Sequence, residues 1–340
     1  MKMRASVLME PGRIEVHDID SPEVSKGALL VRVKAALTCG TDLKAFMRGH
    51  PMIPMPGVFG HEFSGIVERT GKEVEEFREG DEVMSVHSAP CLECRYCRKK
   101  AFNLCEKIMS TKVLGAFAEY ILLPAHIVKQ NVFHKPKSLT HEEAAFLEPL
   151  SCVMHGIESV GIRAEDTALV IGAGPIGLLH LLLLKQKGVQ VAIMDINEQR
   201  LEIAESAGAD LCLSPGKVRE GIAEFTDRIG VDVVFECTGM PEVWEKSLYY
   251  SRKGGTVVLF GGCKAGTRVT YDTDLLHYHE ITLRGVFHYT PSNVHDAYKM
   301  LSGGRFDVKK LISGRYSLEQ VEHAFIALSR GKGIKYVIIP

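Results

Sequence analysis

Several features that mark specialised classes of protein are scarce or missing in this chain. Its 41 basic and 42 acidic residues give a formal net charge of −1, so no excess of positive charge favours nucleic acid or an anionic membrane. The longest apolar run, LLHLLLLK (178–185), is too short to span a bilayer and contains a histidine. The first residues, MKMRASVLMEPGRIEVHD, lack the apolar core of a signal peptide. We therefore expect a cytoplasmic protein with neither a membrane nor a nucleic-acid partner.

Cysteine, by contrast, is plentiful in an otherwise ordinary globular composition. The 340 residues are 46% hydrophobic and 24% charged, and this length suggests about two domains. Nine cysteines, an odd number, in a chain expected to be cytoplasmic indicate metal binding or catalysis before disulfides. Those in interpretable patterns are Cys39, Cys91, Cys94, Cys97 and Cys105.

Two styles of sequence divide the chain. Residues 1–149 are short apolar runs broken by Gly and Pro, such as ALLVRVKAAL (28–37), which predicts an antiparallel, partly closed β-barrel. Residues 150–288 alternate strand and helix patterns over six strands, which is typical of a doubly wound parallel sheet. Residues 289–340 end in the strand KYVIIP, and we assign them to the first domain because the parallel sheet is already complete. The predicted fold class is α/β.

The segment GAGPIG (172–177) matches the G-x-G-x-x-G pattern of dinucleotide-binding proteins. It follows a predicted buried strand and opens a predicted helix, so its glycines permit a tight turn and a close approach to a pyrophosphate at the helix N-terminus. At the end of the next predicted strand, Asp195 is placed to accept hydrogen bonds from ribose hydroxyls and to repel a 2′-phosphate. NAD is therefore favoured over NADP.

Two of these residues have alternative explanations. Asp195 is also a candidate N-cap of the helix that follows DINE, and it can serve both purposes. Arg200 either flanks the adenosine ribose, meets a 2′-phosphate, or lies on the helix surface. The predicted cofactor-binding residues are Gly172, Gly174, Pro175, Ile176, Gly177, Asp195 and Arg200.

The stretch CLECRYCRKKAFNLC (91–105) predicts a structural zinc site within a lobe over residues 88–108. Each C-x-x-C step lets two sulfurs converge on one ion, and four thiolates leave no open coordination position. Flanking basic residues would offset the negative charge of such a centre. A redox dithiol or a set of unliganded thiols explains four cysteines at metal spacing less well. The predicted ligands are Cys91, Cys94, Cys97 and Cys105.

A catalytic zinc needs about three protein ligands and an open position, so it must lie elsewhere. Candidates are Cys39 in TCGTD, His61 and Glu62 in GHEFSG, and Glu148 in LEPLSC. Alone, each has a structural explanation: a buried thiol, a core histidine, a solvated strand carboxylate and a helix-start acid. Their joint occurrence before a nicotinamide fold indicates a second metal site. Other histidines, among them His87, lack this context and are interpreted as surface or packing residues.

Taken in order, CGTD (39–42), GHEFSG (60–65), the four-cysteine lobe, EPL (148–150) and GAGPIG (172–177) resemble the zinc-dependent medium-chain dehydrogenases/reductases. This superfamily includes the alcohol, sorbitol and threonine dehydrogenases, and the resemblance covers essentially the whole chain. It implies a Rossmann domain over residues 150–288 and a GroES-like catalytic domain over residues 1–149 and 289–340.

Details of the resemblance favour the polyol branch. Glu148 stands where ethanol-type enzymes have a cysteine ligand, and GVFHY (285–289) is similar to the GVFRY of sorbitol dehydrogenases. Two positions depart from that pattern. His288 replaces an arginine that lies by the substrate, and Lys44 stands where polyol and threonine enzymes commonly have histidine.

The resemblance also implies roles for individual residues. Cys39 and His61 are implied as zinc ligands, and either Glu62 or Glu148 as the third ligand. Thr41 is implied to relay the substrate proton through the ribose of NAD, although a turn hydroxyl is the alternative. Asp42 is interpreted as the partner that orients His61. Phe117, His288 and Tyr289 are candidate pocket walls, with Phe117 equally explained as core.

The implied activity is hydride transfer between NAD and a secondary alcohol, with about two zinc ions per chain. The expected substrate is a polyol, sugar or related hydroxy compound, and L-threonine or a simple diol is the alternative. A zinc-free reductase or a non-enzymatic relative would lack the Cys39 and His61 pair. The resemblance further implies a homo-oligomer, a dimer or a tetramer, for which the strand EITLRGVF (280–287) is a candidate contact edge.

Overall fold

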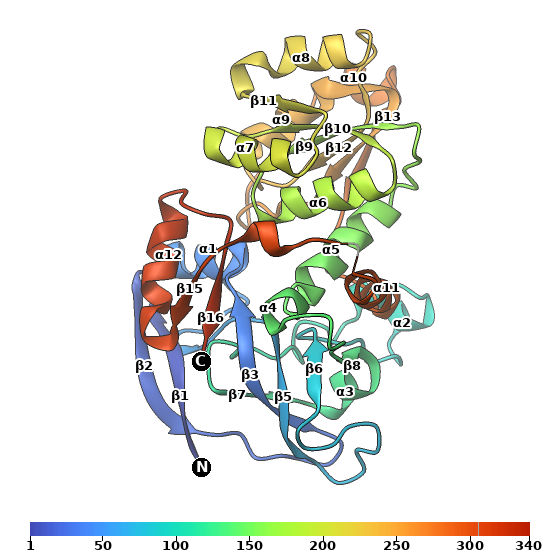
Figure 1. Ribbon diagram of the computed structural model, residues 1–340. Coiled ribbons are helices and arrows are strands. Elements are labelled where there is room, and N and C mark those ends of the chain that lie inside the picture. The colour runs from blue at the N-terminus through green and yellow to red at the C-terminus, as the bar shows by residue number, and fades with distance from the viewer. Residues whose placement is uncertain (305) are drawn as a thin grey trace. The chain divides into compact units, whose positions relative to one another are not determined.

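The computed structural model describes residues 1–304 and 306–340 and divides the chain into two compact units. Unit 1 comprises Met1–Ser151 and Tyr289–Pro340, and unit 2 comprises Cys152–His288. Helix α5 (Leu147–Glu158) runs across the boundary between them in sequence. Unit 2 is therefore inserted into unit 1 along the chain (Figure 1).

A seven-stranded mixed sheet forms the centre of unit 1. Its order is β15-β16-β3-β5-β6-β8, with β7 also paired to β3. Strand β16 runs parallel to β15 and antiparallel to β3. The strands are β3 (Leu29–Leu37), β5 (Glu62–Thr70), β6 (Glu82–Ser85), β7 (Tyr120–Leu123), β8 (Val132–His134), β15 (Ile312–Ser317) and β16 (Lys335–Ile339).

A smaller sheet and several helices complete unit 1. The sheet has the order β2-β1-β4, from β1 (Lys2–Glu10), β2 (Arg13–Asp20) and β4 (Gly57–Val58). The helices are α1 (Gly40–Arg48), α2 (Arg95–Arg98), α3 (Ala125–Asn131), α4 (His141–Ala144), α11 (Pro291–Ser302) and α12 (Val321–Ser329), with short 3₁₀ turns at η1 (Phe102–Leu104), η4 (Lys309–Leu311) and η5 (Leu318–Gln320).

Aromatic side chains fill the core of unit 1. Phe59, Phe117 and Phe325 contact one another with ring centroids 4.9 to 5.9 Å apart, and all three are fully buried. Edge-to-face pairs of this kind stabilise a core beyond the area they bury. Of the two explanations that the sequence left open for Phe117, the structure supports core packing.

Unit 2 is a six-stranded parallel sheet with the order β11-β10-β9-β12-β13-β14. The strands are β9 (Thr167–Ile171), β10 (Gln190–Met194), β11 (Leu211–Leu213), β12 (Val231–Glu236), β13 (Ser251–Leu259) and β14 (Thr282–Gly285). The connecting helices are α6 (Pro175–Gln186), α7 (Glu198–Ser206), α8 (Val218–Phe225), α9 (Pro241–Ser247) and α10 (Thr273–His277), with 3₁₀ turns η2 (Pro215–Lys217) and η3 (Leu248–Tyr250).

One predicted helix is shorter than its sequence pattern suggests. The pattern PEVWEKSLYYSRKG predicts a helix through residue 254, but α9 ends at Ser247 and β13 begins at Ser251. Ser251 pairs with Val231 of β12, so tertiary strand pairing overrides the local helical pattern.

Within the described part of the chain, no helix has the length and apolar character needed to cross a membrane.

Candidate active site and metal centres

Four cysteine sulfurs gather in the lobe around α2. The Sγ atoms of Cys94 and Cys97 lie 3.5 Å apart, as do those of Cys91 and Cys105, and all four lie within 4.8 Å of one another. The backbone N–H groups of Cys91 and Lys107 point at Cys105 Sγ, at 3.3 and 3.4 Å. Four sulfurs at this spacing, with backbone donors directed at one of them, fit a tetrahedral thiolate zinc site.

The pKa values of two lobe thiols, Cys94 and Cys97, are shifted in opposite directions. Backbone N–H groups of Cys97 and Glu106 lower the pKa of Cys94 to about 6, whereas burial raises the pKa of Cys97 to about 12. Of the flanking bases, Lys107 donates to the Glu93 carboxylate at 2.6 Å and Arg98 donates to the Glu93 carbonyl at 2.6 Å. These two bases are thus engaged by Glu93 on the rim of the lobe.

The second cluster of candidate ligands centres on His61. Cys39 caps the N-terminus of α1, and His61 directly precedes β5. The ligand atoms of Cys39, Asp42 and His61 lie within 4.8 Å of one another, and those of His61, Glu62 and Glu148 form a second such group. The structure thus brings all four predicted catalytic-metal residues to one place, with Asp42 beside them.

Strand register explains how distant segments reach this place. Leu37, at the end of β3, pairs with Glu62 on one side and with Val337 of β16 on the other. The Thr38 N–H then donates to the Tyr336 carbonyl at 3.0 Å, and the Tyr336 N–H donates to the Thr38 side-chain hydroxyl at 3.0 Å. Cys39 follows directly, so the ends of three strands converge on the cluster.

The Glu62 carboxylate is fully buried, and its two oxygens have different surroundings. Its Oε2 accepts a short hydrogen bond from Lys335 Nζ, which also donates to the Thr38 carbonyl at 2.8 Å. Its Oε1 is buried without a hydrogen-bond partner in the described structure, and one oxygen of Glu62 lies within 4.8 Å of ligand atoms of His61 and Glu148. An orphaned buried carboxylate oxygen beside an imidazole and a second carboxylate fits a divalent cation.

This arrangement corrects the simpler explanation of Glu62 as a solvated strand residue. Glu62 and Lys335 are each 1% exposed. Lys335 is not among the site residues predicted from the sequence. The available signal is a charged residue opening an otherwise apolar terminal strand, KYVIIP, because a buried lysine requires an anionic partner.

Burial and neighbouring charges have opposite effects on the pKa values of His61 and Glu62. Burial acts to lower the pKa of His61, but the Asp42 carboxylate and the Cys39 thiol outweigh it and raise that pKa well above its ordinary range. Asp42 Oδ1 lies 3.4 Å from His61 Nδ1. Burial raises the pKa of the Glu62 carboxyl, and the Lys335 ammonium opposes that rise. A buried cluster so rich in acceptors is suited to a cation.

His87 is a further residue of this cluster that the sequence analysis set aside as surface or packing. Its ring centroid lies 4.9 Å from that of His61, and its Nδ1 lies 3.5 Å from Glu148 Oε1. Tyr289, a predicted pocket wall, is buried beside it, with its hydroxyl 3.4 Å from His87 Nδ1. The only local signal was the proximity of His87 to the cysteine lobe in sequence.

Two further predicted residues of unit 1, Thr41 and Lys44, lie on α1, and His288 is the last residue of unit 2. Thr41 begins the first turn of α1, where its backbone N–H points at Cys39 Sγ at 3.5 Å. Lys44 lies one turn further along the same helix. His288 has a backbone φ of 63°, which is unusual for a residue with a side chain.

The dinucleotide-type loop of unit 2 has the close approaches that its glycines predict. Gly172 has a φ of 100°, and a Cβ on Gly177 would lie 1.8 Å from the Gly172 carbonyl oxygen. Gly174 caps α6, whose first residue is Pro175, followed by Ile176. The helix N-terminus is thus open to an anionic group.

Asp195 and Arg200 both face this loop. Asp195 Oδ2 accepts from the Ala173 N–H at 2.6 Å, and its Oδ1 accepts from the Asn197 N–H at 2.8 Å. Asn197, whose side chain accepts from the Arg200 N–H, is the N-cap of α7, so the proposed capping role of Asp195 is wrong. An Nη1 of Arg200 lies 4.0 Å from where a Gly174 Cβ would be, which places the guanidinium beside the loop rather than on the outer helix surface.

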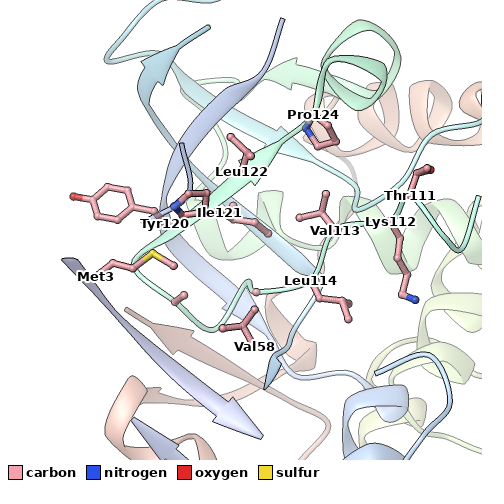
Figure 2. Close-up of a pocket in the computed structure, with 13 residues that line it drawn as sticks. Met3, Val58, Thr111, Lys112, Val113, Leu114, Tyr120, Ile121, Leu122 and Pro124 are labelled. Atoms are coloured by element: carbon pink, nitrogen blue, oxygen red, sulfur yellow. The ribbon is translucent and has the colours of Figure 1, made fainter. Parts of the chain in front are cut away.

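Unit 1 also has an apolar groove of about 400 Å³ away from these residues (Figure 2). It is lined by residues 111–115, 118, 120–122 and 124, together with Met3, Pro22 and Val58. None of the predicted catalytic residues is among those that line it. The groove is therefore separate from the candidate metal cluster.

Comparison with known families accounts for both units. Residues 25–136 match the alcohol dehydrogenase GroES-like domain, and residues 175–303 match the zinc-binding dehydrogenase family.

Individual relatives span the whole chain. The chain is 30% identical to a sorbitol dehydrogenase of Halalkalibacterium halodurans, over 97% of this chain and 96% of that protein. It is 30% identical to an L-threonine 3-dehydrogenase of Pseudoalteromonas translucida, over 99% of both. Among solved structures, a zinc-binding dehydrogenase of Sinorhizobium meliloti bound to NADP superposes with a TM-score of 0.89, at 31% identity over 100% of both chains.

Proposed function

Because the chain belongs to the zinc-dependent medium-chain dehydrogenases/reductases, we propose that it transfers hydride between NAD and a secondary alcohol that is a polyol, a sugar or a related hydroxy compound. The family membership confirms the resemblance and the α/β fold class predicted from sequence, and it makes the chain a zinc-binding oxidoreductase that uses a nicotinamide cofactor.

The observation that carries the proposal is the cluster of Cys39, His61, Glu62 and Glu148, in which the histidine and both carboxylates are buried. When bound, zinc acts as a Lewis acid that lowers the pKa of a substrate hydroxyl, and NAD accepts the hydride. We assign the cluster to this catalytic zinc and the four lobe cysteines to a structural zinc, which makes about two ions per chain.

The chain's own groups have separate tasks in this proposal. Asp42 faces His61 Nδ1 at 3.4 Å and orients the imidazole. Lys335 holds Glu62 by its Oε2 and leaves Oε1 without a hydrogen-bond partner in the described structure. Thr41, at the start of α1, is assigned the transfer of the substrate proton at its hydroxyl.

We assign NAD rather than NADP on the charge beside the loop. The Asp195 carboxylate lies at the end of β10 and is tied to the loop by the Ala173 N–H, so it presents negative charge where a 2′-phosphate would sit. Arg200, beside Gly174, supports the opposite choice, and the Sinorhizobium meliloti relative holds NADP. The Asp195 carboxylate accepts a hydrogen bond from the loop itself, whereas Arg200 Nη1 lies 4.0 Å from the position that a Gly174 Cβ would occupy. We therefore give Asp195 the greater weight.

A polyol is favoured over threonine by the carboxylate-rich cluster and by GVFHY (285–289). The sorbitol dehydrogenase relative supports this assignment, and the L-threonine 3-dehydrogenase relative keeps threonine as the second candidate.

The decisive experiment is a screen of NAD reduction by purified protein. Polyols, aldonates, diols and amino alcohols are compared with and without added zinc, and zinc per chain is measured in parallel. We expect NADH formation with a polyol and about two zinc ions per chain. Turnover of threonine alone would replace the substrate assignment, and one zinc or none per chain would remove the catalytic assignment.

We further propose a homo-oligomer in a reducing compartment such as the cytoplasm. Strand β14 lies at the edge of its sheet, and Thr282 and Arg284 on it are exposed, so it is a candidate contact edge for a second copy. All nine cysteines lie in the described part of the chain, and none of them forms a disulfide there. A monomer by sedimentation equilibrium would contradict the oligomer.

A further inference from the structure

We propose that His87 is a positioning residue that fixes the Glu148 carboxylate at the candidate metal centre, as the inner end of a hydrogen-bonded chain that begins at Ser88 and passes through Tyr289. The inference rests on the proposed function, because Glu148 matters chemically only if the cluster binds a metal. It concerns a residue outside the ligand groups themselves.

His87 contacts both Glu148 and His61. Its Nδ1 lies 3.5 Å from Glu148 Oε1, and its ring centroid lies 4.9 Å from that of His61. The side chain of His87 is 6% exposed and that of Glu148 is 7% exposed. A histidine buried against two candidate ligands, but not itself grouped with them, is placed to orient a ligand rather than to replace one.

The Ser88 end of this hydrogen-bonded chain is held by other buried groups of unit 1. Ser88 Oγ and the Tyr289 hydroxyl lie 2.9 Å apart, and Asn131 Nδ2 donates to the Ser88 carbonyl at 2.7 Å. The Val113 N–H donates to the His87 carbonyl at 2.8 Å. Because Ser88, Tyr289 and Asn131 are all buried, the imidazole is held from its backbone and from its ring.

The chemistry of the acceptor sets the direction of the hydrogen bonds. A carboxylate oxygen accepts only, so the Nδ1 atom that faces Glu148 carries the ring proton. The same N–H is then shared with the Tyr289 oxygen at 3.4 Å, and the Tyr289 O–H donates outward to Ser88 Oγ. Every member of the chain therefore has a partner.

The two carboxylates beside His61 thus contact partners of different chemical type. Glu62 is held by the Lys335 ammonium, which compensates its negative charge. Glu148 instead faces the His87 imidazole, whose Nδ1 lies 3.5 Å from Glu148 Oε1. Loss of the His87 imidazole removes this contact from Glu148, whereas Glu62 keeps its contact with Lys335. We therefore expect loss of His87 to loosen the metal site specifically on the Glu148 side.

Three substitutions of His87 separate positioning from packing. Asn places an amide N–H where the Nδ1–H stands, Gln places one nearer the Nε2 position, and Leu removes both donors. The first readout is zinc affinity of the second site, measured by competition with a chelator. The second is the visible d–d spectrum of cobalt-substituted protein, which reports ligand geometry and requires no turnover.

We expect His87→Leu and His87→Gln to weaken metal binding at the second site by about 10-fold or more and to shift the cobalt bands. His87→Asn retains the donor, so its affinity and spectrum stay close to those of the wild type. Tyr289→Phe removes the middle link, and we expect a smaller shift in the same direction.

Two results would overturn the inference. Unchanged affinity and spectrum in His87→Leu would show that Glu148 needs no donor, and equal losses in the Asn and Gln variants would show that His87 acts by packing alone. If the Leu variant does not fold, the comparison of Asn with Gln still decides. A wild-type protein that binds only the lobe metal would instead overturn the proposed function, so the two failures are distinguishable.

Discussion

Lys335 and Glu62 form an ion pair in which each side chain is 1% exposed, and the two residues are 273 positions apart in sequence. The ammonium also donates to the Thr38 carbonyl and lies 5.9 Å from the centre of the Phe146 ring. The last strand of unit 1 therefore carries the counter-ion of a candidate metal-site carboxylate.

Replacing Lys335 with Met is expected to destabilise unit 1 strongly. It leaves the Glu62 charge buried without compensation, which costs about 3–5 kcal/mol when one partner of a buried pair is removed. The measurement is the free energy of unfolding in urea of metal-free protein, in which no bound cation can replace the Lys335 charge. The double variant Lys335→Met, Glu62→Gln should recover most of the loss.

A matched control for this prediction is the exposed pair of Lys2 and Asp20, whose side chains are 65% and 81% exposed. Lys2→Met should cost at most about 1 kcal/mol, because water screens such pairs. Similar unfolding free energies for the Lys335 and Lys2 variants would contradict the importance assigned to the buried pair.

Asp195→Ala is expected to relax the choice between NAD and NADP. The substitution removes the negative charge beside the loop and the hydrogen bond to the Ala173 N–H. We expect KM for NAD to rise by about 10-fold, equivalent to about 1.4 kcal/mol, while KM for NADP falls. Steady-state kinetics with both cofactors test this, and an unchanged ratio of the two KM values would reject Asp195 as the discriminating residue.

Cys97→Ser is expected to remove the structural zinc and to leave the second metal in place. The lobe would lose one of its four sulfurs, so zinc per chain should fall from about two to about one. Metal analysis and limited proteolysis within residues 88–108 measure the change. Cys212→Ser is the control, because the Cys212 thiol contacts the Leu201 carbonyl in unit 2 and belongs to neither metal group.

His180 predicts a pH dependence of stability. Burial lowers the pKa of His180 to about 4 in the folded protein, and its Nδ1–H donates to the Ile176 carbonyl at 2.9 Å. The unfolded chain binds a proton below about pH 6.5 while the folded chain stays neutral, so stability falls as pH drops from about 6.5 to about 4. The loss then levels off, because both states are protonated.

Between pH 7 and pH 5 the wild type should lose about 2 kcal/mol more than His180→Leu, in which this proton is absent. Urea unfolding of both proteins at the two pH values gives the comparison. Parallel losses in the two proteins would show that His180 is not the group responsible.

Sequence reasoning succeeded where a short segment determines its own geometry. The turn GAGPIG requires glycine at 172 and 177 because of a left-handed backbone and a carbonyl contact, and both requirements are visible in a six-residue pattern. The four cysteines of the lobe are equally local. The fold class followed from the alternation of strands and helices, which needs no knowledge of tertiary contacts.

It failed where the partner lies far away in sequence. His87 and Lys335 reach the cluster only through strand pairing and the return of the chain at Tyr289, and neither has a motif around it. Likewise, the early start of β13 depends on Val231 of a neighbouring strand. Such contacts are set by register, which a single sequence specifies weakly.

The insertion of unit 2 into unit 1 has a consequence for the order of events during protein synthesis. The ribosome completes residues 152–288 before it makes β15 and β16, so unit 2 has its entire chain while the sheet of unit 1 still lacks two strands. Until residue 335 emerges, Glu62 has no counter-ion. A nascent chain released before that point would carry a complete Rossmann-type unit, but its candidate metal site would lack the Lys335 partner of Glu62.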